Sequence, residues 1–400
     1  MQKMKYLIKS FFRAFFSTIK NFVTKKNIII FSGITNYSYN GNSRYLFEYL
    51  SKNTDYEIYW FTRSDEIKKH IKNNGMQYLS YDNPLKLIYK SLFMKIVIND
   101  GDSYFNIFDL ADSINTYRIS IFHGYGPKTT IAALGDSNEI KMRINKINKF
   151  NYVNFTSNYT ADNVSRDVFC LPSSKVKILG FPKMDSFYDQ DYTKKCIKSK
   201  NKLKNFFDSV SNDSKLILYT PTWRPYTYNL PLLDITNFDA KCFNDYLETN
   251  NLYFIYSLHS VNKPKNIINN MSRIHYIDEN YSLYDTNEMM LEADILMNDY
   301  SNTLVEFSVL ARPQVFCIPD FEYYKKMKGF IDDFLDIMPG ESFVTFSDLK
   351  RILDNVIKDS NAYVDRFTER RKRLLLKYYN LDNNKSMESY KNFIHEIINK

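Results

Sequence analysis

Ser301, Asn302 and Thr303 occupy a position in the sequence that suits phosphate binding. They stand between a short apolar run, 294–297, that predicts a buried strand, and an apolar-periodic run, 304–310, that predicts a helix. The first N–H groups of a helix have no intrahelical partner and carry partial positive charge, so an anion binds there readily. An ordinary helix cap explains the same three residues, because Ser, Asn and Thr are common caps.

Two carboxylates flank this segment. Asp299 directly precedes it and is a candidate catalytic residue. Glu306 lies seven residues beyond Asp299, two helical turns further on nearly the same face, where it fits hydrogen bonds from a ribose diol. The competing interpretation of Glu306 is a solvated helix carboxylate.

A second cluster begins at His123, which an apolar strand delivers to a glycine-rich loop. Gly124 and Gly126 permit close approach of backbone to a ligand, and Lys128 supplies positive charge. A histidine is suited to act as a base at neutral pH, so His123 is a candidate catalytic residue. The alternative is a loop histidine with its hydrogen bonds satisfied.

Three further segments carry candidate residues. Thr220, Thr222 and Arg224 follow another apolar strand, and a guanidinium there fits bidentate phosphate binding. His259 follows the next strand and is suited to donate to phosphate or to protonate a leaving group. Lys183 lies in a turn that closes the first half of the chain. A surface arginine and an ordinary domain-junction turn are the competing interpretations.

Strand-like and helix-like segments alternate along the chain, which predicts an α/β fold with mostly parallel sheets and helices on both faces. The alternation stops in a polar stretch, 186–214, and then starts again. We therefore expect one doubly wound domain over 27–185, a connection over 186–214, a second domain over 215–360 and helices over 361–400. Two such domains predict a ligand site between them, at the carboxyl ends of the strands.

Residues 1–26 form a separate segment with seven basic residues and no acidic one. Within 4–23 the apolar residues fill one half of a helical wheel and the basic ones cluster opposite, which predicts a helix lying on an anionic membrane surface. Charges interrupt the segment too early for a membrane span, and no signal-peptide cleavage pattern is evident. Packing on the protein's own core or on a partner helix remains an alternative.

Composition excludes several classes of function. The net charge is +9, and without residues 1–26 it falls to +2, because 54 − 7 = 47 basic residues face 45 acidic ones. A nearly neutral body argues against nucleic-acid binding. The four cysteines form no CxxC pair, and no zinc-binding spacing occurs, so we expect a reduced cytoplasmic protein without a structural metal.

Taken in order, these clusters resemble the CDP-glycerol glycerophosphotransferase family of teichoic acid primases and polymerases. That family shows a His-Gly-x-Pro-Leu-Lys loop, a Gly-x-Pro-Arg-x-Asp turn, an Ala-Pro-Thr-Trp-Arg strand end, a Leu-His-Pro turn and a Thr-Asp-Tyr-Ser-Ser segment. The corresponding segments here are 123–128, 180–185, 219–224, 258–260 and 298–302. The chain departs from the pattern in the loop after His123, at Lys183 and Ser260, and at Asn298 and Asn302.

The resemblance implies two facing Rossmann-like domains in the GT-B arrangement, preceded here by the amphipathic N-terminal helix. It implies transfer of glycerol phosphate from CDP-glycerol to a hydroxyl of a lipid-linked or polymer acceptor, with release of CMP and without a cofactor or metal. His123 would then take the proton of the acceptor hydroxyl. Lys128, Arg224, His259 and the helix start at Ser301 would neutralise the phosphates.

Two other functions compete with this one. One keeps the fold and uses CDP-ribitol or a nucleotide sugar as donor. The other is a non-catalytic membrane-bound scaffold. A lipid-linked acceptor places the enzyme peripherally at the cytoplasmic face of the cell membrane, and the sequence leaves oligomerisation open.

Overall fold

A computed structural model describes residues 18–19, 22–35, 37–101, 115–128, 138–165, 169–222, 224, 226–227, 229–258, 265–277, 283–379 and 385–400. His259 and nearly all of the predicted amphipathic helix over 4–23 lie outside these residues, so both stay predictions. Within the described residues, no helix combines the length and apolar character that crossing a bilayer requires.

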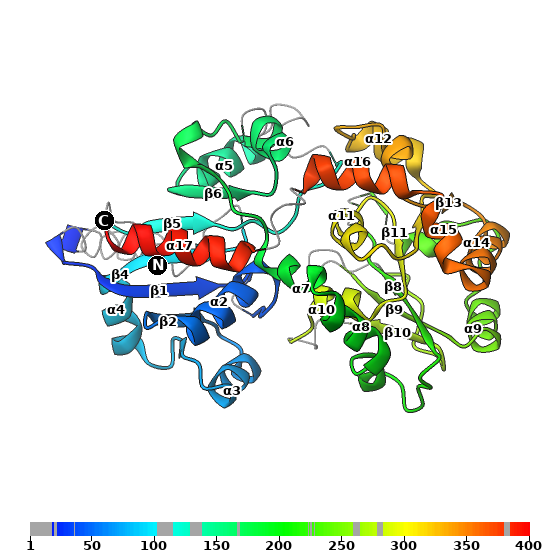
Figure 1. Ribbon diagram of the computed structural model, residues 1–400, viewed down its shortest axis with the longest axis horizontal. Coiled ribbons are helices and arrows are strands. Elements are labelled where there is room, and N and C mark those ends of the chain that lie inside the picture. The colour runs from blue at the N-terminus through cyan, green and yellow to red at the C-terminus, as the bar shows by residue number, and fades with distance from the viewer. Residues whose placement is uncertain are drawn as a thin grey trace, which may run out of the picture.

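The first half of the chain forms a parallel sheet that has seven strands among the described residues, in the order β3-β2-β1-β4-β5-β6-β7 (Figure 1). The strands are β1 (Lys26–Ser32), β2 (Glu57–Phe61), β3 (Tyr78–Leu79), β4 (Met94–Asn99), β5 (Tyr117–Ser120), β6 (Tyr152–Phe155) and β7 (Val176–Ile178). The helices are α2 (Gly41–Asn53), α3 (Asp65–Asn73), α4 (Pro84–Phe93), α5 (Asn138–Ile147) and α6 (Asn158–Thr160). The interior strand β1 is buried from Ile28 to Ser32, because helices cover both faces of a parallel sheet.

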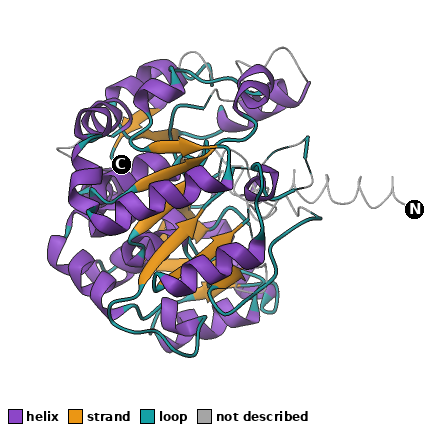
Figure 2. Cartoon of the chain, turned by 90° about the vertical axis from the view of Figure 1, so that its right-hand side faces the viewer, coloured by secondary structure: helices purple, strands orange, loops and turns teal. Residues whose placement is uncertain are grey.

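The second half forms a parallel sheet with six strands among the described residues, in the order β10-β9-β8-β11-β12-β13. The strands are β8 (Lys215–Tyr219), β9 (Leu252–Ser257), β10 (Ile274–Ile277), β11 (Ile295–Asn298), β12 (Gln314–Cys317) and β13 (Glu341–Phe343). The helices are α9 (Ala240–Thr249), α10 (Thr286–Glu292), α11 (Thr303–Phe307), α12 (Phe321–Met327), α13 (Phe334–Ile337), α14 (Phe346–Lys358) and α15 (Ser360–Asp365). Figure 2 shows the strands lying between helices on either side.

The two halves are joined twice. The first crossing runs through α7 (Asp185–Tyr188) and α8 (Gln190–Ser199), so part of the stretch expected to be a plain connection is helical. After α16 (Thr368–Tyr378) the chain returns to the first domain, where α17 (Ser386–Ile398) lies over the first sheet in Figure 1. There Phe393 packs edge-on against Tyr152 of β6, with 5.0 Å between the ring centroids.

The doubly wound parallel architecture predicted from the sequence is confirmed, in two sheets with the same kind of strand order. Two edge strands, β7 and β13, were not predicted, because three residues are too few to show an alternation or an apolar run. Cys317 is fully buried in β12. The proposed domain boundaries themselves stay predictions.

Candidate functional site

The strand order reverses direction between β1 and β4 in the first sheet and between β8 and β11 in the second. In open parallel sheets such a switch point is where the loops on either side diverge and a ligand binds. The polar segments singled out from the sequence follow the strands at and beside these two points. Each of these polar segments therefore lies at the end of its domain that faces the other domain.

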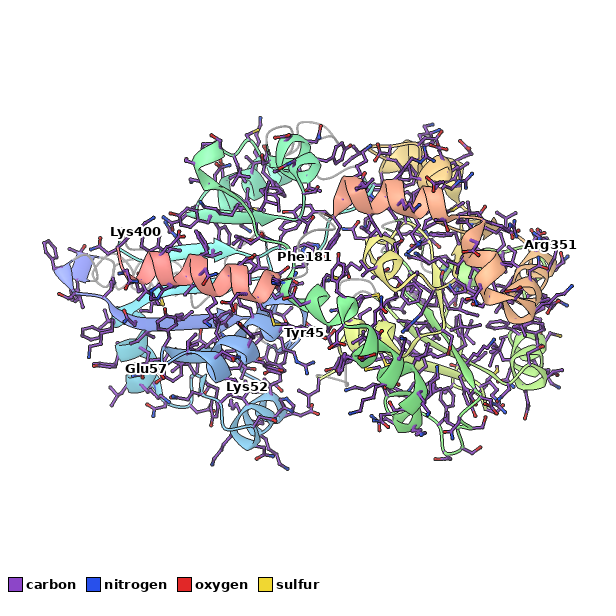
Figure 3. All side chains as sticks on the ribbon, viewed as in Figure 1. Tyr45, Lys52, Glu57, Phe181, Arg351 and Lys400 are labelled. Atoms are coloured by element: carbon purple, nitrogen blue, oxygen red, sulfur yellow. The ribbon has the colours of Figure 1, made fainter. Side chains whose placement is uncertain are left out.

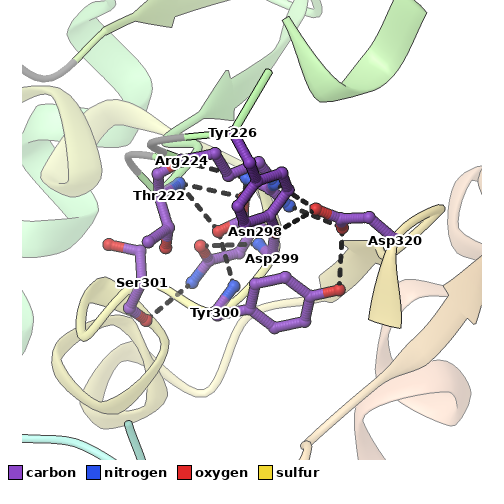
Figure 4. A network of polar contacts seen from close by, with 8 residues as sticks. All are labelled: Thr222, Arg224, Tyr226, Asn298, Asp299, Tyr300, Ser301 and Asp320. Carbon is purple, nitrogen blue, oxygen red and sulfur yellow. Dashed lines mark hydrogen bonds and ion pairs between the residues drawn. The ribbon is translucent and has the colours of Figure 1, made fainter. Parts of the chain in front are cut away.

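Arg224 is the centre of a buried polar network after β8, β11 and β12 (Figure 4). Its Nη1 atom lies 2.6 Å from Oδ2 of Asp299, and its Nε and Nη2 atoms donate to the two carboxylate oxygens of Asp320 at 2.5 and 3.0 Å. The guanidinium carbon also lies 5.1 Å from the ring centroid of Tyr300. Burial acts to lower the pKa of Arg224, but the two carboxylates outweigh it and hold the pKa above its ordinary value.

The carboxylate of Asp299 belongs to the same network, and its oxygens already accept several hydrogen bonds. Its carboxylate accepts the Thr222 N–H on both oxygens at 2.9 Å and also accepts the N–H of Tyr300, and the side chain is fully buried. This differs from the roles expected from the sequence, a catalytic residue for Asp299 and a phosphate ligand for Arg224. A buried, paired carboxylate is poorly placed to take a proton, and a guanidinium held by two carboxylates has little capacity left for phosphate.

The segment Ser301–Thr303 forms the turn into α11, as predicted, although the regular α-helix is short and continues as a 3₁₀ turn over Ser308–Leu310. The hydroxyl of Thr303 lies 2.8 Å from that of Thr220 after β8, and it accepts a hydrogen bond from Asn298 at 3.2 Å. Asn298 also donates to the carbonyl of Ser301 at 3.3 Å. These contacts fix the turn against the neighbouring strand.

The His123 loop of the first domain meets this turn of the second. The side chain of Asn302 donates to the carbonyl of Gly124 at 3.0 Å. At Gly126 a Cβ atom would lie 2.5 Å from Oδ1 of Asn302, so the loop approaches this closely only because the residue is glycine. The His123 side chain is exposed, and its ring stacks on Phe122 with 4.7 Å between centroids.

Lys183 and Glu306 form a second link between the domains. Their ion pair spans 2.7 Å and both side chains are nearly fully buried. The ammonium group of Lys183 also donates to the carbonyl of His123 at 3.2 Å, so it ties the candidate base to the second domain. Burial raises the pKa of Glu306, and the charge of Lys183 opposes the rise.

Lys128 lies where the two domains pair along their backbones. It forms an antiparallel bridge with Phe330, and the carbonyl of Pro127 accepts the Ile331 N–H at 2.8 Å. Burial lowers the pKa of Lys128 to about 8; the charges of Arg224 and Lys328 act in the same direction and Asp299 opposes them. A lysine in such surroundings is stabilised in its charged form by a bound anion.

Sequence reasoning singled out neither Asp100 nor Asp320, which the structure places in buried or partly buried polar contacts. Asp100 follows β4 at the first switch point and is buried, and Ser43 donates to its Oδ1 through the backbone N–H at 2.8 Å and the hydroxyl at 3.0 Å. Burial raises the pKa of Asp100 to about 7. The signal was present, since an apolar run closing on Asn99-Asp100-Gly101 repeats the pattern seen at Asp299. Among the described residues, no three His, Cys, Asp or Glu side chains gather as metal ligands.

Two facing parallel α/β domains, with polar side chains gathered at the strand ends between them, are the arrangement of the GT-B fold. The family model for CDP-Glycerol:Poly(glycerophosphate) glycerophosphotransferase matches residues 13–396, and the chain belongs to this family. The resemblance drawn from the sequence motifs is thereby confirmed.

Individual relatives agree. The chain is 24% identical to the teichoic acid poly(glycerol phosphate) polymerase of Bacillus spizizenii, over 91% of this chain and 92% of the polymerase. It is 26% identical to the teichoic acid glycerol-phosphate primase of Bacillus subtilis, over 71% of this chain and 72% of the primase. Its fold is similar to that of the wall teichoic acid polymerase TagF, with a TM-score of 0.77 at 19% identity, covering 97% of this chain and 93% of that one.

We expect Arg224→Lys to destabilise the protein by about 3–5 kcal/mol, because a single ammonium group cannot satisfy both the buried carboxylate of Asp299 and the partly exposed one of Asp320. The free energy of unfolding by urea measures this. Arg351→Lys is the matched control: Arg351 pairs with Glu341 at the outer edge of the second domain (Figure 3) and is half exposed, so the change there should stay below about 1 kcal/mol. If Arg224→Lys leaves the free energy of unfolding unchanged but abolishes activity, the result would instead support a phosphate-binding role for Arg224.

The raised pKa of Asp100 predicts a pH dependence of stability. Between about pH 4 and pH 7 the folded state holds a proton on Asp100 that the unfolded state has lost, so the contribution of Asp100 to stability falls as the pH rises. Asp100→Asn removes this loss. Its stability relative to wild type should therefore be higher at pH 8 than at pH 5 by about 2–3 kcal/mol. If the variant and the wild type differ in free energy of unfolding by the same amount at both pH values, the pKa of Asp100 is not raised in the folded state.

Proposed function

We propose that this chain transfers glycerol phosphate from CDP-glycerol to a hydroxyl of a lipid-linked or polymer acceptor in teichoic acid or capsule synthesis, releasing CMP. The observation that carries the proposal is the contact between the His123 loop and the Ser301–Glu306 segment across the domains. It brings the candidate base of one domain to the candidate phosphate-binding turn of the other. Family membership supports the same reaction.

In this reaction the acceptor oxygen attacks the phosphorus that carries glycerol, and the bond from that phosphorus to the CMP oxygen breaks. His123 accepts the proton of the attacking hydroxyl. Lys128 and the N–H groups of the turn at Ser301 and Thr303 stabilise the phosphate oxygens, and His259 stabilises or protonates the leaving group. Positioning and charge neutralisation provide most of the catalysis in phosphoryl transfer, which suits a site built from fixed cations and backbone groups.

Arg224 and Asp299 act in this proposal as positioning residues. Their ion pair holds the backbone from which the turn at Ser301 begins. Glu306 retains the ribose-binding role expected from the sequence, with its carboxylate oriented by Lys183. Gly124 and Gly126 let the loop backbone approach the substrate, and Thr222 supports the carboxylate of Asp299.

CDP-ribitol remains a second candidate donor for a specific reason. The chain is also 23% identical to the teichoic acid ribitol-phosphate polymerase TarL of Staphylococcus aureus, over 86% of this chain and 59% of TarL. The two polyol donors share the nucleotide and diphosphate, so the groups described above serve either one. A donor screen that measures consumption of CDP-glycerol and of CDP-ribitol decides between the two, because we expect the enzyme to consume only one of them.

Features near the N-terminus support a position at the cytoplasmic face of the membrane. Phe22 is 87% exposed and Leu85, on α4, is 80% exposed. Lys26 reaches from the end of the predicted amphipathic segment to the hydroxyl of Tyr89 on α4, at 2.7 Å. Exposed apolar side chains beside lysines fit the interface of an anionic bilayer.

We expect His123→Ala to abolish acceptor-dependent CMP release, lowering the rate by about 10²–10⁴-fold through loss of the base. The assay uses purified protein, CDP-glycerol and a membrane-lipid acceptor fraction. His395→Ala is the control, because His395 lies on α17 and contacts Tyr56 away from the site. Full activity of the His123 variant would exclude His123 as the base, whereas absence of CMP release by the wild type with every donor would favour the scaffold interpretation.

Binding of CDP-glycerol should take up a proton near pH 8. Lys128 has a pKa of about 8 without ligand, and a bound diphosphate raises it, so binding at pH 8 should take up as much as about half a proton per site. Calorimetric titration without acceptor, in two buffers of different ionisation enthalpy, measures the uptake. Lys128→Met should bind with no uptake, and equal uptake by variant and wild type would exclude Lys128.

A further inference from the structure

The loop that carries His123 begins with an uncommon backbone conformation. Phe122, the residue before His123, lies in the left-handed region with φ +67°. An aromatic side chain makes this conformation costly, so it persists only where the surrounding structure holds it. The buried ring of Phe122 stacks on Tyr125 with 4.9 Å between centroids and meets Phe169 edge-on at 5.5 Å. Aromatic packing therefore holds the loop on its core side.

Three consecutive carbonyl groups of this loop, 122–124, each accept a hydrogen bond from a different side chain. The donors, at 2.8, 3.2 and 3.0 Å respectively, are Asn42 of α2, Lys183 and Asn302. The peptide groups on both sides of His123 are thus fixed. Asn42 and Lys183 belong to the first domain, whereas Asn302 reaches the loop from the second.

The side chain of Asn302 does not serve the helix that it precedes. Asn302 is the residue before α11, and its side chain makes no capping hydrogen bond there. Its amide instead lies against the loop. A Cβ atom at Gly126 would lie 2.5 Å from Oδ1 and 3.1 Å from Cγ of Asn302, and a Cβ atom at Gly124 would lie 3.4 Å from its Nδ2. The two glycines therefore provide the space that the amide occupies.

The placement of His123 matters because a general base must lie within hydrogen-bond reach of the hydroxyl that it deprotonates. An error of about 1 Å in such a position can cost about a hundredfold in rate. The ring of His123 is exposed and stacks on Phe122, so its position depends on the backbone on either side of it. A donor that reaches this backbone from the second domain couples the domain contact to the placement of the ring.

We propose that Asn302 is a positioning residue that aligns His123 for proton transfer from the second domain, and that Gly126 gives its amide the room to do so. The inference rests on the proposed function, in which His123 is the base. It assigns the side chain of Asn302 to the loop and not to a phosphate. Where the two domains are in contact, the amide fixes the Gly124 carbonyl and with it the backbone that follows His123.

The first test asks whether Asn302 acts through His123. Asn302→Ala should lower kcat for CMP release by about 10–100-fold and leave the KM for CDP-glycerol unchanged, because it disturbs the base and not the donor. In a His123→Ala background the same substitution should have no further effect, since the group that it positions is gone. An equal loss in that background would overturn the inference, because Asn302 would then act independently of the base.

The second test uses the crowding at Gly126. Gly126→Ala should lower kcat as Asn302→Ala does, because the new Cβ atom displaces the amide. In the Asn302→Ala background it should have no further effect, since the nearest atom of residue 302 is then Cα at 3.4 Å. Gly75→Ala is the control: a Cβ atom there meets nothing within 4 Å, and kcat should stay unchanged in both backgrounds. Fully additive losses from Asn302→Ala and Gly126→Ala would contradict the coupling.

The third test needs no turnover. The chain has five histidines, and the NMR signal of the His123 side chain is identified by its loss in His123→Ala. In ligand-free protein, Asn302→Ala and Gly126→Ala should each move this signal and leave the other histidine signals in place, which also shows that the variants fold. A His123 signal that neither substitution moves would overturn the inference. A moved signal in a protein that releases no CMP with any donor would support the contact and count against the proposed function alone.

Discussion

The buried cation of Arg224 is the constraint on which the second domain's site depends. Moving a guanidinium out of water is costly unless opposite charges meet it in good geometry. Asp299 and Asp320 supply those charges from the ends of β11 and β12, and the Thr222 carbonyl after β8 accepts a further hydrogen bond at 2.9 Å. Three neighbouring strand ends are therefore fixed around one side chain, and the backbone that enters α11 has a single position.

The fixed turn allows the first domain to engage the second. Asn302 reaches the Gly124 carbonyl, and Glu306 meets Lys183. Arg44 of α2 adds a third contact, 2.8 Å from Glu288 of α10. These three links are polar, and buried apolar side chains of both domains also belong to one continuous cluster, among them Phe181 of the first domain and Leu304 of the second. The polar links therefore fix the relative position of the two domains, while the apolar cluster stabilises the contact between them.

The sequence predicted where the site lies better than it predicted what each side chain does. Parallel strands bring their carboxyl ends to one edge, so polar residues after apolar runs, such as His123 and Ser301, were expected together. Whether Arg224 faces solvent or the core depends on partners after other strands, and no local pattern contains that information. Asp100 closes an apolar run as Asp299 does, but that pattern alone does not reveal that its side chain is buried and accepts hydrogen bonds from Ser43. His259 and the helix over 4–23 stay predictions.

Burial acts in opposite directions on two charged groups of the first domain. It lowers the pKa of Lys128 to about 8; Asp299 opposes this, and the charges of Arg224 and Lys328 add to it. It raises the pKa of Asp100 to about 7. Both groups therefore change protonation near neutral pH, where a nearby ligand with a charge of the opposite sign stabilises the charged form. In the proposed reaction the donor diphosphate is such a ligand for Lys128, and His123 lies on the same loop.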